Sequence, residues 1–280
     1  MMKLTLYDTV SLRCSRIVTR GYSTSFSLGI MMLGKKHRKA IYAIYGFVRL
    51  ADEIVDTFFD KQQKEMLDEF RHDTCMAIKN GINMNPVLHS FQWAVNRYRI
   101  DMEYIEAFLF SMEMDLKQTS HDEQSYNRYI YGSAEAVGLM CLRVFCHDDP
   151  EKFDKLKEPA RKLGSAFQKV NFLRDIKSDF TDRGRVYFPG VDFNNFRSED
   201  KMTIEKDIAA EFNEALTGIR GLDRGSRRGV YLAYSYYLAL FMKIKKTAPA
   251  AVTLKRFRIT DLRKILLLIK AVVYDVTGLI

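Results

Sequence analysis

Two pairs of aspartates stand one helical turn apart in segments that are otherwise largely apolar. Asp52 and Asp56 lie in AIYGFVRLADEIVD, and Asp175 and Asp179 lie in LGSAFQKVNFLRDIKSDF. Carboxylates four residues apart share one face of a helix and repel each other unless a cation lies between them. Oxygen ligands of this kind suit Mg²⁺, which completes its shell with water and substrate phosphates. The pairs therefore predict Mg²⁺ sites, with Mn²⁺ as an alternative metal, that bind a phosphorylated substrate.

A solvated helix face is the alternative explanation for either pair. With 35 acidic residues among 280, about four pairs at this spacing are expected by chance. Solvated faces show alternating Lys and Glu, whereas both pairs have apolar neighbours. Because an uncompensated buried carboxylate pair is costly, the apolar flanks favour metal sites.

Further polar side chains extend each pair along its helix face. Tyr45 and Arg49 precede the first pair, and Gln168 and Asn171 precede the second, at spacings of three and four residues. The planar guanidinium of Arg49 matches the geometry of phosphate oxygens. We expect Tyr45, Arg49 and Gln168 to contact the substrate, and Asn171 to join the aspartates as a metal ligand.

Helices must position these side chains, because apolar residues recur at the helical period along most of the chain. The sequence predicts helices over residues 8–20, 36–59, 62–79, 86–97, 101–118, 122–146, 151–180, 201–222, 226–247 and 254–274. A loop is expected over residues 181–197, where Asp-Arg-Gly-Arg and Pro-Gly follow the second pair. With five prolines and no linker or repeat, residues 1–280 are expected to form one all-α domain, a helical bundle.

Composition and charge narrow the classes of partner. The formal net charge of +9 suits nucleic acid, an anionic membrane surface and phosphorylated substrates alike. The chain has no zinc-finger pattern, RNP-type strand or dense basic stripe, so no nucleic-acid partner is expected. It also has no secretory leader and no uncharged apolar run of about 18 residues. We expect a cytoplasmic monomer that is soluble or peripheral to a membrane.

The C-terminal segment, residues 254–280, carries six basic residues beside the apolar run Ile265–Leu268. A basic amphipathic pattern of this kind is typical of a helix that lies on a membrane surface. It is also typical of a last helix that packs on the core, and that simpler interpretation is favoured here.

Four blocks in this order resemble the signatures of the head-to-head isoprenyl diphosphate synthases, the squalene and phytoene synthases, with phytoene synthases as the best match. The blocks are GYSTSFSLGIMML, KKHRKAIYAIYGFVRLADEIVD, YIYGSAEAVGLM and QKVNFLRDIKSDFTDRGRVYFP. The resemblance implies an isoprenoid-synthase-type bundle around a central cavity. It also implies that both aspartate pairs coordinate Mg²⁺ on substrate diphosphates.

The resemblance implies roles for residues outside the pairs. Tyr131 matches a tyrosine that the family places near the reacting carbons, so it is assigned a catalytic role. Aromatic faces stabilise a carbocation, so Tyr45 and Tyr237 are further candidates, although core packing is the simpler explanation for each. The residues that match substrate-binding positions of the family are Ser23, Ser25, Phe26, Arg49, Gln168, Asn171, Arg185 and Tyr187.

Two positions depart from the pattern of many relatives. Glu53 replaces an aspartate within the first motif, DEIVD, although the spacing from Asp52 to Asp56 is intact. Glu135 stands where many relatives have glycine. Its carboxylate is expected either to face the cavity or to pair with an arginine, and the sequence leaves both alternatives open.

By this resemblance, the chain is a prenyltransferase that condenses two geranylgeranyl diphosphates to phytoene, through a cyclopropyl intermediate, and releases diphosphate. NADPH is not expected for that reaction. The alternative is a squalene or dehydrosqualene synthase that uses farnesyl diphosphate, because cavity depth sets the chain length and the sequence does not show it. An alternative of another class is a non-catalytic, membrane-associated assembly or binding relative, against which the intact aspartates argue.

Overall fold

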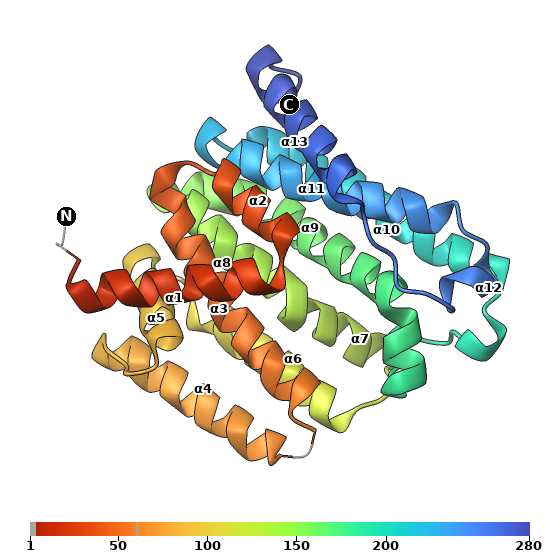
Figure 1. Cartoon of the computed structure of the whole chain (residues 1–280), viewed down its shortest axis with the longest axis horizontal. Coiled ribbons are helices and arrows are strands. Elements are labelled where there is room, and N and C mark those ends of the chain that lie inside the picture. Colours follow the sequence, from red (N-terminus) through yellow and green to blue (C-terminus); the bar gives the residue numbers. More distant parts are fainter. Residues whose placement is uncertain (1–3, 60) are drawn as a thin grey trace.

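Helices form all the regular elements of the computed structural model, which describes residues 4–59 and 61–280 (Figure 1). The predicted all-α class is thereby confirmed. The elements, in which η marks a π-helical or 3₁₀ turn, are α1 (Leu6–Tyr22), α2 (Thr24–Met32), α3 (Lys35–Thr57), α4 (Gln63–Asn80), α5 (Pro86–Tyr98), α6 (Met102–Lys117), α7 (Glu123–Ile130), η1 (Tyr131–Glu135), α8 (Ala136–Phe145), α9 (Pro150–Ile176), η2 (Lys177–Asp182), η3 (Phe193–Asn195), α10 (Ser198–Gly221), α11 (Arg224–Lys245), α12 (Pro249–Val252) and α13 (Asp261–Thr277).

The structure differs from the predicted helices in its short elements and near the C-terminus; the short helices η3, within the predicted loop, and α12 were not predicted. The short helix α2 was not predicted, because it is apolar on all sides and has no amphipathic period. Ser23 starts it, since its hydroxyl accepts a hydrogen bond from the backbone N–H of Phe26 at 3.1 Å. The last helix begins at Asp261 and not at residue 254. Thr260 caps its N-terminus.

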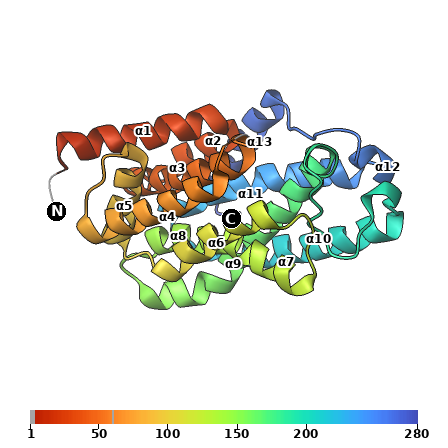
Figure 2. The same cartoon turned by 90° about the horizontal axis from the view of Figure 1, so that it is seen from below.

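The long helices α3 and α9, which carry the two aspartate pairs, lie on opposite walls of one cavity. Buried residues form one large hydrophobic cluster around Phe47 and Phe108, on the α3 side, and another around Phe172 and Phe212, on the α9 side. Side chains from both clusters line the cavity. The predicted bundle around a central cavity is therefore the observed architecture, and Figure 2 shows its layers from below.

The wide, π-helical turn η1 lies between α7 and α8, in the middle of the helix that these three segments form. A Cβ on Gly132 in η1 would lie 2.2 Å from the backbone oxygen of Ala107 in α6. A Cβ on Gly164 in α9 would lie 2.5 Å from the backbone oxygen of Ala134 in η1. Two glycines thus allow η1 to pack directly against the backbones of both neighbouring helices.

Replacing Gly132 should therefore destabilise the protein strongly. We expect Gly132→Ala to lower the free energy of unfolding by about 3 kcal/mol, because α6 must move to make room for the methyl group. Thermal unfolding measures the change. Gly21→Ala is the matched control, since nothing lies within 4 Å of a Cβ there. Equal melting temperatures for the two variants would contradict the close packing of η1.

Candidate active site

One cavity, with a volume of about 1480 Å³, collects all the predicted site residues except Tyr131. Those residues are Ser23, Ser25, Phe26, Tyr45, Arg49, Asp52, Asp56, Gln168, Asn171, Asp175, Asp179, Arg185, Tyr187 and Tyr237. The charged side chains of both aspartate pairs and the arginines beside them are linked by ion pairs, and most of the other lining residues are apolar. The arrangement suits a ligand with an anionic head and a long apolar tail.

Tyr131 is not among the residues that line the cavity, so its predicted catalytic placement is wrong. Its hydroxyl donates to Glu103 Oε1 at 3.3 Å, and its ring lies under the guanidinium of Arg161. Tyr129, two residues earlier, lines the cavity instead, and it is 3% exposed. The helical turn places residues 129 and 131 about 200° apart around the axis, so only one of them can face inward.

The first aspartate pair lies on α3 beside Arg49, whose guanidinium is held in place by neighbouring side chains. Arg49 forms an ion pair with Glu53 at 2.5 Å and lies 3.7 Å from Asp52. The guanidinium also stacks over the Tyr22 ring, 4.3 Å from its centroid. Glu53, which departs from the family pattern, therefore orients Arg49 at the cavity rim.

The second pair lies where α9 widens into the π-helical turn η2. Asp175 is the penultimate residue of α9 and Asp179 belongs to η2. Two arginines contact the Asp175 carboxylate, Arg174 through Nε at 3.0 Å and Arg256 through Nε at 2.7 Å. Arg256 precedes α13, so this residue brings the C-terminal segment to the cavity rim.

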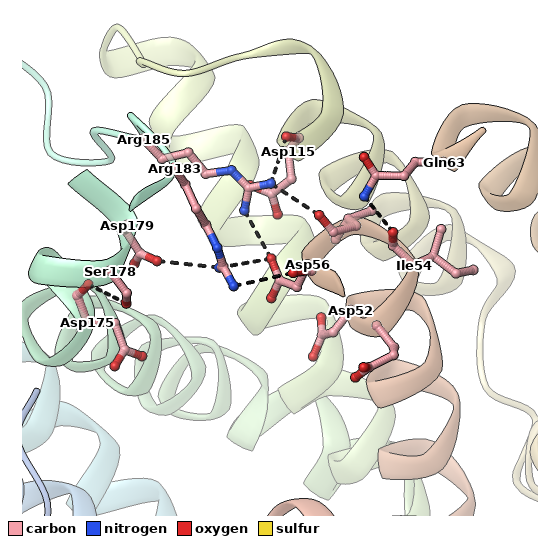
Figure 3. A network of polar contacts seen from close by, with 12 residues as sticks. Asp52, Ile54, Asp56, Gln63, Asp115, Asp175, Ser178, Asp179, Arg183 and Arg185 are labelled. Atoms are coloured by element: carbon pink, nitrogen blue, oxygen red, sulfur yellow. Dashed lines mark hydrogen bonds and ion pairs between the residues drawn. The ribbon is translucent and has the colours of Figure 1, made fainter. Parts of the chain in front are cut away.

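Two arginines of the segment after η2 connect the walls of the cavity (Figure 3). Nη1 of Arg183 lies 3.1 Å from Asp56 Oδ1 and 3.6 Å from Asp179 Oδ1, so it bridges the two pairs. Nη1 of Arg185 also lies 3.1 Å from Asp56 Oδ1, and its Nη2 donates to the backbone oxygen of Asp115. A cation thus occupies the space between opposed carboxylates.

Asp115 on α6 is a site residue that the sequence interpretation missed. Its carboxylate is 6% exposed and accepts hydrogen bonds from the hydroxyls of Tyr129 at 2.8 Å and Tyr187 at 3.1 Å. It also lies 3.9 Å from Arg185. The available signal was a single aspartate at helical spacing from buried Phe108 and Met112.

Burial makes three of these carboxyl groups easier to protonate. It raises the pKa of Asp52 and of Asp179 to about 7, and like-charged neighbours add to the effect. It raises the pKa of Asp115 to about 6, although Arg185 acts in the opposite direction. Near neutral pH, Asp52 and Asp179 therefore carry their full charge only when further positive charge lies close to them.

The residues present fit Mg²⁺ that is shared with a substrate. Among residues 4–59 and 61–280, no three carboxylate, imidazole or thiol groups converge as a complete protein cage. Mg²⁺ does not need such a cage, since one or two carboxylates, water and phosphate oxygens suffice. Oδ1 of Asp175 is buried and accepts no hydrogen bond, despite its ion pair with Arg256. Asn171 already accepts from the Tyr237 hydroxyl at 3.3 Å, so it is the weaker candidate ligand.

The raised pKa of Asp179 predicts how the stability of the metal-free protein depends on pH. The folded protein holds a proton there up to about pH 7, whereas the unfolded chain releases it near pH 4. Stability is therefore lost as the pH rises through this window. In EDTA at pH 8, Asp179→Asn should melt several degrees above the wild type, and the difference should shrink at pH 5. A difference that does not change with pH would contradict the burial of this carboxylate.

Aromatic rings form part of the apolar wall beneath the charged rim. The Tyr237 ring stacks on Phe167 with centroids 3.9 Å apart, and Phe26 lies between Tyr237 and Tyr45 at 5.9 and 5.5 Å. Burial raises the pKa of Tyr45 to about 12, so its hydroxyl stays neutral. The wall presents ring faces and no anionic phenolate to the cavity.

The open question about Glu135 has a structural answer. Its carboxylate accepts a hydrogen bond from Nε of Arg161 at 2.7 Å, and Arg161 also pairs with Glu158. Glu135 is not among the cavity-lining residues. The carboxylate therefore ties η1 to α9.

The fold and the cavity define a helical protein of the isoprenoid-synthase type. A profile of the squalene/phytoene synthase family matches residues 19–211 of this chain. The chain therefore belongs to the squalene/phytoene synthase family, as its sequence blocks predicted.

Individual relatives agree with this assignment at modest identity. Phytoene synthase 1 of Zea mays is 27% identical over 261 residues, which cover 83% of this chain and 61% of the maize protein. Presqualene diphosphate synthase of Zymomonas mobilis is 35% identical over 176 residues, 61% of this chain and 58% of that protein. The match thus spans about three fifths of the length of these curated relatives.

Solved structures support the fold. A crystal structure of a dehydrosqualene synthase superimposes with a TM-score of 0.81 and covers 95% of this chain and 97% of its own chain. The sequence identity is 19%, so the likeness concerns the fold alone. The cytoplasmic location, the monomeric state and the single domain expected from the sequence stay predictions.

Proposed function

We propose that this chain condenses two molecules of geranylgeranyl diphosphate head to head, forms phytoene and releases diphosphate. The observation that carries the proposal is the division of a single cavity into a charged rim and an apolar interior. Such a cavity can bind two diphosphate heads at the rim while it encloses both prenyl tails. Because the sequence relatives are a phytoene synthase and a presqualene diphosphate synthase, prenyl diphosphates are the substrate class to test first.

The arginines at the rim supply the binding energy for the diphosphates. Arg49, Arg174, Arg183 and Arg256 each line the cavity next to an aspartate of one pair. Guanidinium groups bind phosphate oxygens in a planar, two-pronged geometry. When substrate enters, they can exchange carboxylate partners for phosphate oxygens, and the aspartates become free to bind metal.

The metal would be held by Asp52 and Asp56 on one wall and by Asp175 and Asp179 on the other. Bound Mg²⁺ supplies electrostatic stabilisation for the departing diphosphate as the allylic C–O bond breaks. The protein contributes by aligning the heads and by keeping water from the carbocation that remains. Phe26, which lies between two other rings, presents a face that stabilises positive charge.

Small side chains in the cavity lining leave room for the longer prenyl chain. Gly138, Ala160 and Ala215 are among the lining residues. The maize relative, which matches over most of this chain, is a phytoene synthase. Condensation of farnesyl diphosphate to a squalene-type or dehydrosqualene product is the second candidate, which the sequence similarity to presqualene diphosphate synthase of Zymomonas mobilis favours.

Product analysis tests the proposal. Purified protein with Mg²⁺ is incubated separately with geranylgeranyl and farnesyl diphosphate, and the extracted hydrocarbons are identified by mass spectrometry. Without NADPH, we expect geranylgeranyl diphosphate to give phytoene, a forty-carbon hydrocarbon with a central triene. We also expect a higher kcat/KM for geranylgeranyl diphosphate than for farnesyl diphosphate. A thirty-carbon product formed at the higher kcat/KM would establish the second candidate instead.

A further inference from the structure

The last helix, α13, has two different faces. Its inner face packs on α11 (Figure 1). There Ala271 joins a small buried cluster with Leu232 and Tyr236, against which partly buried side chains of α2 also pack. Asp275 on the same face is 4% exposed and binds Nε of Arg228 in α11 at 2.9 Å. This ionic contact and the small apolar cluster fix the rotation of α13 about its own axis.

The outer face of α13 is a continuous exposed stripe of large apolar side chains. Its members are 48–70% exposed. They follow spacings of three and four residues along all four turns, so they share an arc of about 100°. The stripe consists of Leu262, Ile265, Leu266, Ile269, Val273 and Val276. The favoured expectation that the last helix packs into the core is correct only for its inner face.

Basic residues border this stripe. Arg263 and Lys270 lie along one edge, and neither forms an ion pair with a carboxylate in the described part of the chain. Residues 254–280 contain six basic and two acidic side chains, and one of those acids, Asp275, is buried. Arg256 pairs with Asp175, and Lys264 pairs with Asp261, so the net positive charge beside the stripe comes from Arg263 and Lys270.

A groove beside the stripe continues the same combination of charge and apolar surface. It lies between α13 and the α1–α2 corner. Its lining consists of the charged residues Arg20, Asp261 and Lys264, the polar residues Thr24 and Ser27, and the apolar residues Leu28, Met31 and Ile265. Met31 is 39% exposed. The apolar surface is therefore broader than one helix, and Arg20 lies at its second edge beside the ion pair of Lys264 with Asp261.

We propose that α13 docks this protein on an anionic lipid bilayer, with the stripe inserted among the acyl chains and the bordering cations at the lipid phosphates. An exposed apolar arc with cations at its margin is the pattern of helices that lie in the membrane interface. No helix within the described residues has the length and apolar character needed to span a bilayer. The contact therefore lies along the membrane surface.

Charge selects the bilayer over a second copy of this chain. Two copies that paired through the stripe would bring their Arg263 and Lys270 borders together, and each chain carries a net charge of +9. An anionic surface attracts the same charges. The bilayer thus satisfies both the apolar stripe and its border.

Docking at α13 also places the cavity beside the lipid. Residues 256–261, which lead directly into α13, line the cavity. A hydrocarbon released there would reach the acyl region of the bilayer without crossing water. This consequence rests on the proposed function, whereas the docking itself rests on α13 alone.

Vesicle flotation tests the docking without any substrate. The full chain is mixed with vesicles of phosphatidylcholine alone or with 30% phosphatidylglycerol, and the bound fraction is measured. We expect binding to the anionic vesicles that weakens with salt. The double variant Ile269→Glu/Val273→Glu should bind at least about tenfold more weakly, since each buried aliphatic side chain contributes about 1.5–3 kcal/mol.

Two controls keep the test specific. Ile82→Glu/Met84→Glu alters equally exposed apolar residues in the α4–α5 connection, and it should bind as the wild type does. Unchanged melting temperatures show that all variants fold. Wild-type protein that stays unbound, or a stripe variant that binds like the wild type, overturns the proposal. The proposal is also overturned if the wild type sediments as a dimer and the stripe variant sediments as a monomer. Flotation without hydrocarbon synthesis would instead refute the proposed function and leave the docking intact.

Discussion

Asparagine in place of Asp52 or Asp175 is expected to lower turnover by at least about 10³-fold while the protein stays folded. Each substitution keeps the size of the side chain and removes one negative charge from a carboxylate that faces the cavity. A neutral amide binds Mg²⁺ weakly, so the charge of the departing diphosphate is left uncompensated. Steady-state kinetics with saturating Mg²⁺ measure the effect, and circular dichroism verifies the fold.

The control for this experiment is Asp68→Asn. Asp68 lies on α4, is about half exposed and forms an ion pair with Lys64 one turn away, as a solvated surface carboxylate does. Its substitution should leave turnover unchanged. If Asp52→Asn and Asp175→Asn behaved like this control, both aspartate pairs would be surface charges and the metal sites would be refuted.

The second large effect is expected at Arg185, which joins three elements of the site. Its guanidinium lies between Asp56 and Asp115, and its side chain is 9% exposed. Arg185→Met keeps most of the volume and leaves those two carboxylates without their shared cation. Breaking a buried ion pair in this way costs about 3–5 kcal/mol. The variant should therefore melt about 5–9 °C below the wild type and lose most of its activity.

The pH dependence of the lost stability shows whether the missing charge of Arg185 is its cause. The pKa of Asp115 is about 6 while Arg185 is present, and removal of the cation raises it further. At pH 5.5 the Asp115 carboxyl is protonated and needs no partner, so the destabilisation should be smaller than at pH 8. Arg197→Met, which breaks the exposed pair with Asp200, should change stability by less than about 1 kcal/mol. An equal loss at both pH values would show that Arg185 acts through packing alone.

The sequence predicted those parts of the fold and site that depend on local spacing. Helical periodicity placed α3 and α9 to within a few residues, and the turn spacing placed Asp52 with Asp56 on one face. The family resemblance predicted that both walls face one cavity, and residues as distant in sequence as Ser23 and Tyr237 line the same cavity. Local period and ordered blocks were sufficient for these features.

The features that the sequence did not predict depend on contacts between distant segments. Asp115 becomes a site residue only because Tyr187 and Arg185 fold back onto α6. Tyr129 lines the cavity in place of Tyr131 because of the rotation of a helix that contains the wide turn η1. Periodicity gives the faces of a helix, but only tertiary packing decides which face turns inward.

The most direct test of the central claim is the stoichiometry of diphosphate release. Purified protein, Mg²⁺ and geranylgeranyl diphosphate are combined, and released diphosphate is counted against extracted hydrocarbon. Head-to-head condensation in one cavity predicts two diphosphates for each molecule of phytoene, with no hydrocarbon in EDTA and recovery when Mg²⁺ is restored. Diphosphate release without a coupled hydrocarbon, or no reaction with either geranylgeranyl or farnesyl diphosphate, would contradict the account.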